Sequence, residues 1–273
     1  MKNILALLFF LICSGVSAQK VEKIWETGKD FKVPESVLYS DTILYVSNVN
    51  GKPTEKNGKG FISKLSTDGQ NITLNWASGL DAPKGMGIYN AKLYVSNIDN
   101  VVVIDLKDGN IINRIEIPNS EFLNDISVSS TGVIAVSDMQ TKTIHFIKND
   151  QLIKSLQNEL FEYVNGLFWD GNILFAGTAG IIYKIKPNED DPIKYIEGTG
   201  GIDGLEKWDG ERFIITDWSG KMQLISTHDQ PIELLNTTEL GIQAADIGFD
   251  PIHHIIFVPT FSNNTVSAYQ LME

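Results

Sequence analysis

Six equivalent places in the sequence carry residues that could act together chemically, each two positions before the first apolar residue of a β-like run. In chain order these residues are Glu35, Lys84, Asn124, Asn165, Asp203 and Ala245. Carboxylate and carboxamide oxygens are the ligands that hard cations such as Ca²⁺ prefer in proteins. Asn165 and Asp203 are each followed by glycine and, taken singly, are more typical of turns than of ligands. The sequence therefore predicts a shared site only if the fold brings these places together.

Two members of this series are each followed directly by an aspartate. Asp125 comes directly after Asn124, and Asp246 comes directly after Ala245. Either Asp125 or Asp203 is suited to accept a proton in a hydrolytic reaction, and Asp246 adds a second acidic contact for a substrate. The net charge of −12 does not by itself indicate cation binding, because an acidic surface most often serves solubility.

An internal repeat of about forty residues supplies the elements that would position these side chains. Its clearest copies read Leu-Tyr-Val-Ser-Asn, at 44–48 and again at 93–97. Related copies lie at 134–138, 174–178, 213–217 and 256–260. The steps between the second residues of successive copies are 49, 41, 40, 39 and 43. This period fits a four-stranded propeller blade, and each copy is flanked by further short β-like runs.

The two ends of the repeat array are complementary. The last unit has a third strand at 265–271 and no fourth, whereas an unassigned β-like run lies at 21–25. Pairing these two runs would close the ring and remove exposed sheet edges. The sequence therefore predicts an all-β, six-bladed β-propeller, closed by pairing of its N- and C-terminal strands, over residues 19–273. A β-sandwich or a two-domain protein is the alternative.

The first eighteen residues are of a different kind. Lys2 precedes an apolar run at 4–13, and small residues precede Gln19, a pattern that predicts a signal peptide at 1–18 and a secreted or periplasmic protein. The only cysteine, Cys13, lies in this segment, so thiol and disulfide chemistry are excluded from 19–273. No other apolar stretch is long enough to predict a membrane span, and the acidic charge disfavours nucleic acid as a partner.

Four short motifs together resemble a known family. Pro34-Glu35, Leu123-Asn124-Asp125, Val164-Asn165-Gly166 and Ile202-Asp203-Gly204 occur in this order at blade spacing. In this respect the chain resembles the family of senescence marker protein (regucalcin), gluconolactonase and luciferin-regenerating enzyme. The resemblance implies a six-bladed propeller and a lactonase that uses a divalent metal, Ca²⁺ or Zn²⁺. It also implies that Glu35, Asn165 and Asp203 bind this metal and that Asn124 and Asp125 lie near the substrate.

Lys84 departs from that pattern, because an ammonium group repels a nearby cation. Three roles remain open for it. The side chain points into solvent, or it pairs with Glu35 or Asp246 and replaces the metal, or it binds a substrate carboxylate or a developing oxyanion. Trp218, just past a repeat copy, either lines the entrance of the site or packs in the structure.

Two functional classes follow from these residues. The first is an exported, metal-dependent lactonase or esterase-like hydrolase that acts on a small molecule at the central axis. In it, Asp203 and Asp125 are catalytic, and Lys84, Asn124 and Asp246 contact the substrate. The alternative is a non-catalytic propeller that binds a small ligand or a protein partner.

Overall fold

The computed structural model describes residues 19–70, 72–186, 189 and 191–272. The expected signal peptide at 1–18 lies outside the described residues. Within the described part of the chain, no helix is long and apolar enough to cross a membrane.

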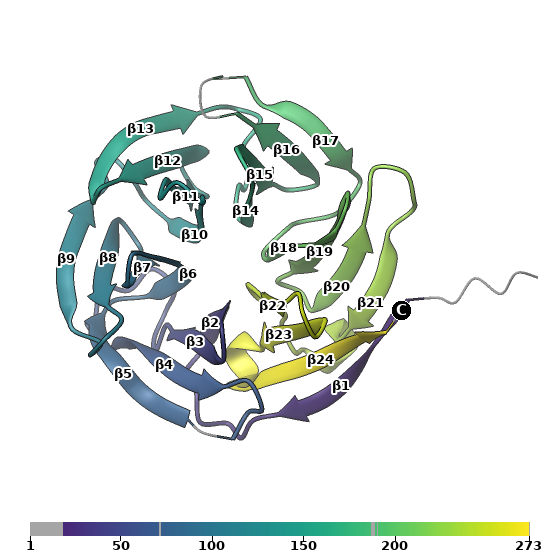
Figure 1. Ribbon diagram of the computed structural model, residues 1–273, viewed down its shortest axis with the longest axis horizontal. Helices are drawn as coiled ribbons and strands as arrows, with labels where there is room; N and C mark the ends of the chain where they lie inside the picture. The colour runs from purple at the N-terminus through teal and green to yellow at the C-terminus, as the bar shows by residue number, and fades with distance from the viewer. Residues whose placement is uncertain (1–18, 71, 187–188, 190, 273) are drawn as a thin grey trace, which may run out of the picture.

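Six four-stranded antiparallel sheets are arranged radially around a central axis, as Figure 1 shows. We number these blades in chain order. Blade 1 contains β2 (Pro34–Ser40), β3 (Ile43–Asn48), β4 (Gly60–Ser66) and β5 (Ile72–Leu80). Blade 2 contains β6 (Pro83–Tyr89), β7 (Lys92–Asn97), β8 (Asn100–Asp105) and β9 (Ile111–Glu116). Blade 3 contains β10 (Leu123–Val128), β11 (Ile134–Asp138), β12 (Thr143–Lys148) and β13 (Gln151–Gln157).

The second half of the ring repeats this order. Blade 4 contains β14 (Leu167–Asp170), β15 (Ile173–Gly177), β16 (Ile181–Ile185) and β17 (Ile193–Glu197). Blade 5 contains β18 (Leu205–Asp209), β19 (Arg212–Asp217), β20 (Lys221–Ile225) and β21 (Ile232–Asn236). Blade 6 contains β22 (Gly248–Asp250), β23 (Ile255–Pro259), β24 (Val266–Met272) and β1 (Lys20–Glu26). The short 3₁₀ helices η1 (Thr238–Leu240) and η2 (Phe261–Asn263) follow β21 and β23.

The ring closes as the sequence predicts. β1 pairs antiparallel with β24 in a register that runs from Lys20 opposite Met272 to Glu26 opposite Ser267. The six repeat copies coincide with the second strand of each blade, whose residues are almost entirely buried. A strand covered on both sides by neighbouring blades needs apolar residues on both faces, which explains why this strand gives the clearest repeat. The predicted six-bladed propeller is confirmed.

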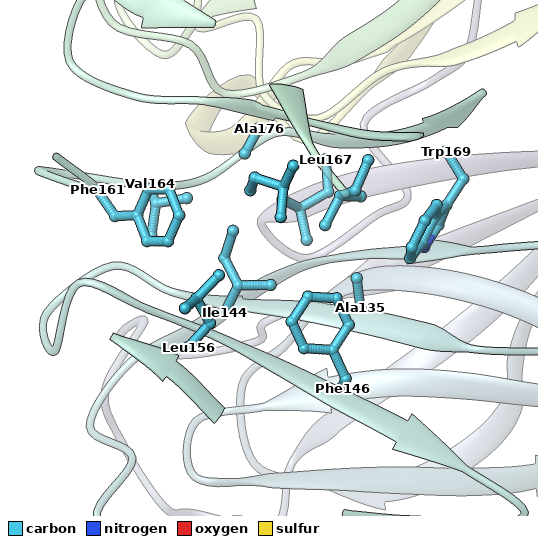
Figure 2. Close-up of a cluster of buried hydrophobic side chains, with 11 residues drawn as sticks. Ala135, Ile144, Phe146, Leu156, Phe161, Val164, Leu167, Trp169 and Ala176 are labelled. Atoms are coloured by element: carbon cyan, nitrogen blue, oxygen red, sulfur yellow. The ribbon is translucent and has the colours of Figure 1, made fainter. Parts of the chain in front are cut away.

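Apolar side chains fill the interfaces between neighbouring blades. Figure 2 shows the cluster between blades 3 and 4, in which Ile144 and Phe146 of β12 face Leu167 and Trp169 of β14. Comparable buried clusters occupy the other five interfaces within the described residues. Because each blade is packed on both sides, the first strand of every blade is held next to the axis (Figure 1).

Candidate functional site

A cavity of about 530 Å³ lies on the axis where the first strands of the blades begin. All five polar residues of the predicted series line it: Glu35 in β2, Lys84 in β6, Asn124 in β10, Asn165 just before β14 and Asp203 just before β18. Ala245, the sixth member, is buried and is not among the lining residues. The expected convergence of side chains from five blades is therefore present in the fold. We call this space the first cavity.

A β-bulge in the inner strand places the polar side chain in three of these blades. The register between the first two strands shifts between Pro34 and Val37 in blade 1, and blades 2 and 3 shift at the equivalent positions. A bulge leaves a backbone N–H without its partner in the ladder. In blade 1 the Ser36 N–H donates instead to Ser47 Oγ at 3.0 Å.

The same hydroxyl contact recurs around the ring. The Asp125 N–H donates to Ser137 Oγ at 2.9 Å, and the Gly204 N–H donates to Thr216 Oγ1 at 2.9 Å. Each acceptor belongs to a copy of the sequence repeat. The repeat thus encodes the support of the site as well as a core strand, a role that the sequence pattern did not reveal.

The last residue of the repeat holds the loop that enters the inner strand. The Lys32 N–H donates to Asn48 Oδ1 at 2.9 Å, and the Asp81 N–H donates to Asn97 Oδ1 at 2.8 Å. In blade 3 the carboxylate of Asp138 takes this role and accepts a bond from the Glu121 N–H at 2.9 Å. These side chains fix the approach to each bulge, so they act through position and not through contact with a ligand.

Glu35 is a buried acid without a hydrogen-bond partner for one of its oxygens. Its side chain is 5% exposed, and Oε2 has no partner among the described residues. Burial raises the pKa of Glu35 well above its ordinary value, and the nearby Asp203 and Asp125 raise it further, whereas Lys84 opposes this rise. Such a group is costly to ionise unless a positive charge comes close.

Asn165 and Asp203, from the neighbouring blades 4 and 5, form a directly bonded pair in the first cavity. Asn165 Nδ2 donates to Asp203 Oδ1 at 2.6 Å, and Asn165 Oδ1 has no partner among the described residues. Burial raises the pKa of Asp203 to about 7, although the bond from Asn165 partly opposes this effect. The first cavity therefore holds two buried oxygens without partners, one on Glu35 and one on Asn165.

The oxygen atoms of these three residues fit a hard cation. Two carboxylates and one carboxamide give an all-oxygen donor set, which suits Ca²⁺ better than a nitrogen- and sulfur-seeking metal. Among the described residues, no group of three or more His, Cys, Asp and Glu side chains has the arrangement of a metal site. No third acidic, histidine or cysteine ligand therefore joins Glu35 and Asp203 in that part of the chain, so a three-ligand set here requires the carboxamide of Asn165.

Lys84 is buried, which excludes a solvated side chain. It is 2% exposed, its Nζ donates to Pro53 O at 3.1 Å and to Ala82 O at 3.0 Å, and it lies 4.5 Å from the ring centre of Phe122. Within the described residues no carboxylate lies at ion-pair distance from Nζ, so the expected direct pair with Glu35 or Asp246 is not found. Burial lowers the pKa of Lys84 to about 8, and the charge of Glu35 opposes this shift.

Asp125 and Asp246 do not line the first cavity. They line a second cavity of about 350 Å³, further along the inner strands, together with Ser36 and Glu206. Successive residues of a strand point in opposite directions, so the residue after each ring position turns away from the first cavity. Asp125 accepts bonds from the N–H groups of Ile126 and Leu167, both at 2.6 Å.

The carboxyl groups that line the second cavity also have raised pKa values. Asp246 Oδ2 accepts a bond from Ser36 Oγ at 2.6 Å, and burial raises the pKa of Asp246 well above its ordinary value. Burial likewise raises the pKa of Asp125 to about 7 and that of Glu206 to about 8. Contact of Asp125 and Asp246 with a substrate in the first cavity, as the sequence position suggested, is not supported by this placement.

Apolar side chains form the wall of the first cavity, and the sequence reasoning missed most of them. Trp218 lines the entrance, in agreement with the first of its two expected roles. The other large apolar lining residues are Phe122, Met139, Tyr163, Ile202 and Phe261. Met139 and Phe261, like Trp218, each directly follow a repeat copy, so the blade spacing carried a signal for them that the sequence reasoning did not use. Tyr163 lies in a connection outside the repeat and has no such signal. Phe122 directly precedes the Leu123-Asn124-Asp125 motif and was the easiest to find.

Comparisons with known proteins identify the fold and no sequence family. No protein-family model matches the chain, and no curated protein is similar to it. A catalytically inactive virginiamycin B lyase from Staphylococcus aureus, solved with quinupristin, has 15% identity and a TM-score of 0.66 over 93% of this chain and 100% of that one. A streptogramin B lyase has 13% identity and a TM-score of 0.68 over 93% of this chain and 98% of that one. At these identities the likeness establishes a shared six-bladed propeller fold.

Proposed function

We propose that the first cavity hydrolyses an ester or lactone bond of a small molecule, with a divalent cation held by Glu35, Asn165 and Asp203. The observation that carries this proposal is the pair of buried oxygens without partners, Glu35 Oε2 and Asn165 Oδ1. Buried polar atoms are nearly always hydrogen-bonded, so two such atoms on residues that line one cavity suit a ligand that satisfies both. The all-oxygen donor set favours Ca²⁺ over Zn²⁺.

The chemistry requires an activated water and a stabilised carbonyl oxygen. When bound, the cation supplies Lewis acidity for both purposes. The carboxylate of Asp203, which lines the cavity, is suited to accept the proton of the attacking water. The water oxygen bonds to the carbonyl carbon, the C–O bond to the leaving alcohol breaks, and the proton passes from Asp203 to the departing oxygen. The product is a carboxylic acid with a free hydroxyl group.

Two further residues have assigned tasks in this proposal. An ammonium has three N–H donors, and Lys84 gives two of them to the carbonyls of Pro53 and Ala82. We assign the third to the oxyanion that develops on the carbonyl oxygen. Asn124, which lines the same cavity, orients the substrate. Asp125 is left out of the reaction, because its carboxylate holds the backbone of β10 and β14.

Metal analysis and hydrolysis by one variant test the proposal. We expect the purified protein to bind one equivalent of Ca²⁺ and to hydrolyse simple lactones. Glu35→Gln should abolish both, since it removes a charged oxygen donor, whereas Glu239→Gln on the exposed surface should change neither. Calcium binding and hydrolysis that survive Glu35→Gln would refute the assignment.

A second candidate function is supported by Lys84. Burial favours the neutral form of the carboxyl groups, so without a cation Lys84 can dominate the charge of the first cavity. In this form the propeller would be non-catalytic and would bind a small anionic ligand, or a protein partner through the same mouth. Absence of both metal and turnover, together with binding of small carboxylates that is lost in Lys84→Met, would select this function.

The proposed hydrolase is an exported protein. We expect residues 1–18 to be removed on export to the periplasm or the medium. Mass spectrometry of the protein from the cell envelope fraction and the medium tests this, because cleavage leaves Gln19 as the first residue. An uncleaved chain in the cytoplasm would contradict it.

A further inference from the structure

We infer that the substrate carries an apolar, ring-sized group beside the reacting carbonyl, and that Tyr163, Trp218 and Phe261 bind this group at the mouth of the first cavity. This inference rests on the proposed function for the reaction and on the cavity wall for the substrate class. Tyr163 and Trp218 are large side chains that remain 59% and 53% exposed although they line a cavity. Exposed aromatic residues around a concave site are typical of ligand recognition.

The backbone holds two of these rings in an unfavourable conformation. Tyr163 has a φ of 53° and Phe261 a φ of 48°, in the left-handed region that bulky residues rarely adopt. Such strain persists only where the surrounding structure imposes it, and it is concentrated at functional sites. Here both strained aromatic residues face one cavity.

Neighbouring contacts account for both positions. Phe161 and Val164 are fully buried in the cluster of Figure 2, so the chain between them directs Tyr163 outward. On blade 6, Asn264 Oδ1 accepts a bond from the Val33 N–H at 2.8 Å and anchors the turn that carries Phe261. The rings of Trp218 and Phe261 meet edge to face, with centroids 5.5 Å apart. The three aromatic side chains are therefore presented by fixed segments.

The polar residues line the same cavity as this apolar wall and would set the orientation of the substrate. A polyhydroxy lactone would place its hydroxyl groups against aromatic rings and lose hydrogen bonds to water without replacement. An aryl or alkyl lactone would instead bury its apolar part there and direct its carbonyl toward Asp203 and Lys84. The volume of about 530 Å³ lies within the range of about 300–1,000 Å³ that is typical of pockets for drug-sized ligands.

Binding without turnover tests the wall separately from the chemistry. We would titrate the protein calorimetrically with 2-naphthoate and with gluconate, which share one carboxylate and differ in their apolar or polyhydroxy body. We expect 2-naphthoate to bind at least about tenfold more tightly, and Trp218→Ala or Tyr163→Ala to reduce this preference about tenfold. Ile252→Ala, at an exposed apolar residue in the turn between β22 and β23, should leave the preference unchanged. Thermal melting confirms that each variant is folded.

Kinetics with dihydrocoumarin and D-glucono-1,5-lactone distinguish a failure of the proposed hydrolase function from a failure of the inferred substrate class. Binding of 2-naphthoate without hydrolysis of either lactone would reject the hydrolase and support the apolar wall. Faster hydrolysis of gluconolactone than of dihydrocoumarin would support the hydrolase and overturn this inference. Equal binding of the two carboxylates, or a preference insensitive to both aromatic substitutions, would overturn it as well.

Discussion

Asp203→Asn should stabilise the cation-free protein at alkaline pH, although it removes a proposed catalytic residue. Asp203 is 6% exposed, and burial raises its pKa from 3.8 to about 7. An acid whose pKa is raised in the folded state contributes stability that is fully present below its unfolded pKa and is lost as the pH rises through the folded pKa. The wild-type protein should therefore lose stability between about pH 4 and pH 8 from this group, and an asparagine should not.

The size of the effect follows from the shift. One pKa unit corresponds to about 1.4 kcal/mol, so a shift of about three units gives an upper limit of about 4 kcal/mol. The contact with Asn165 Nδ2 opposes the gain by a small amount, because an amide oxygen still accepts this bond, although less strongly than a carboxylate. We expect a net increase of about 2–4 kcal/mol in the free energy of unfolding at pH 8.5 and little change at pH 4.

Urea denaturation in the presence of a chelator measures this difference at both pH values. Asp41→Asn, at an exposed residue, is the matched control and should behave as the wild type. Adding Ca²⁺ at pH 8.5 should stabilise the wild type and leave Asp203→Asn nearly unchanged, since ligand binding stabilises only a protein that retains the site. A variant less stable than the wild type at pH 8.5 without Ca²⁺ would refute the picture of a buried, destabilising carboxylate.

Three other substitutions probe neighbouring parts of the axis. Lys84→Met should lower the rate of hydrolysis at least about 100-fold at saturating lactone, because it removes the donor assigned to the oxyanion. The surface control Lys107→Met should hydrolyse at the wild-type rate, and a wild-type rate for Lys84→Met would exclude the assignment. Glu206→Gln, in the second cavity, should raise the melting temperature at pH 9 and leave it unchanged at pH 4, because burial raises the pKa of Glu206 from 4.5 to about 8 and the wild type loses this stability as the pH rises between those two values. A decrease at pH 9 would contradict this. Ser47→Ala should reduce the free energy of unfolding by about 1–3 kcal/mol in urea, because the buried Ser36 N–H loses its acceptor, and an unchanged midpoint would show that the bulge does not need this hydroxyl.

The fold was predictable because its signal is repeated six times. A strand that is buried on both faces, such as β3 with Leu44 on one face and Tyr45 on the other, needs apolar residues in every blade. The missing strand of blade 6 could be identified by its absence at the C-terminal end. The polar ring was predictable for the same reason, since symmetry brings equivalent positions such as Glu35 and Asp203 to one axis.

The division between the two cavities was not predictable from spacing. Asn124 and Asp125 are adjacent in sequence, yet the bulge and the alternation of the strand turn them into different cavities. The environment of Lys84 was also open, because its acceptors are the carbonyl of Pro53, from another blade, and that of Ala82. The aromatic wall depends on connections such as the one carrying Tyr163, whose conformation follows from tertiary packing and not from a repeated pattern.

The pairing of β1 with β24 has a consequence for how the ring assembles. Lys20 and Met272 are 272 − 20 = 252 positions apart, so the last blade cannot be completed until the two most distant strands of the array meet. The entropic cost of closing a loop grows only slowly with its length, but such a distant contact forms late, after the local hairpins. Until then blade 6 presents the unpaired edge of β24, and blades 1 to 5 form an open arc. Glu35 of blade 1 and Phe261 of blade 6 thus take their final places around the first cavity only when the ring closes.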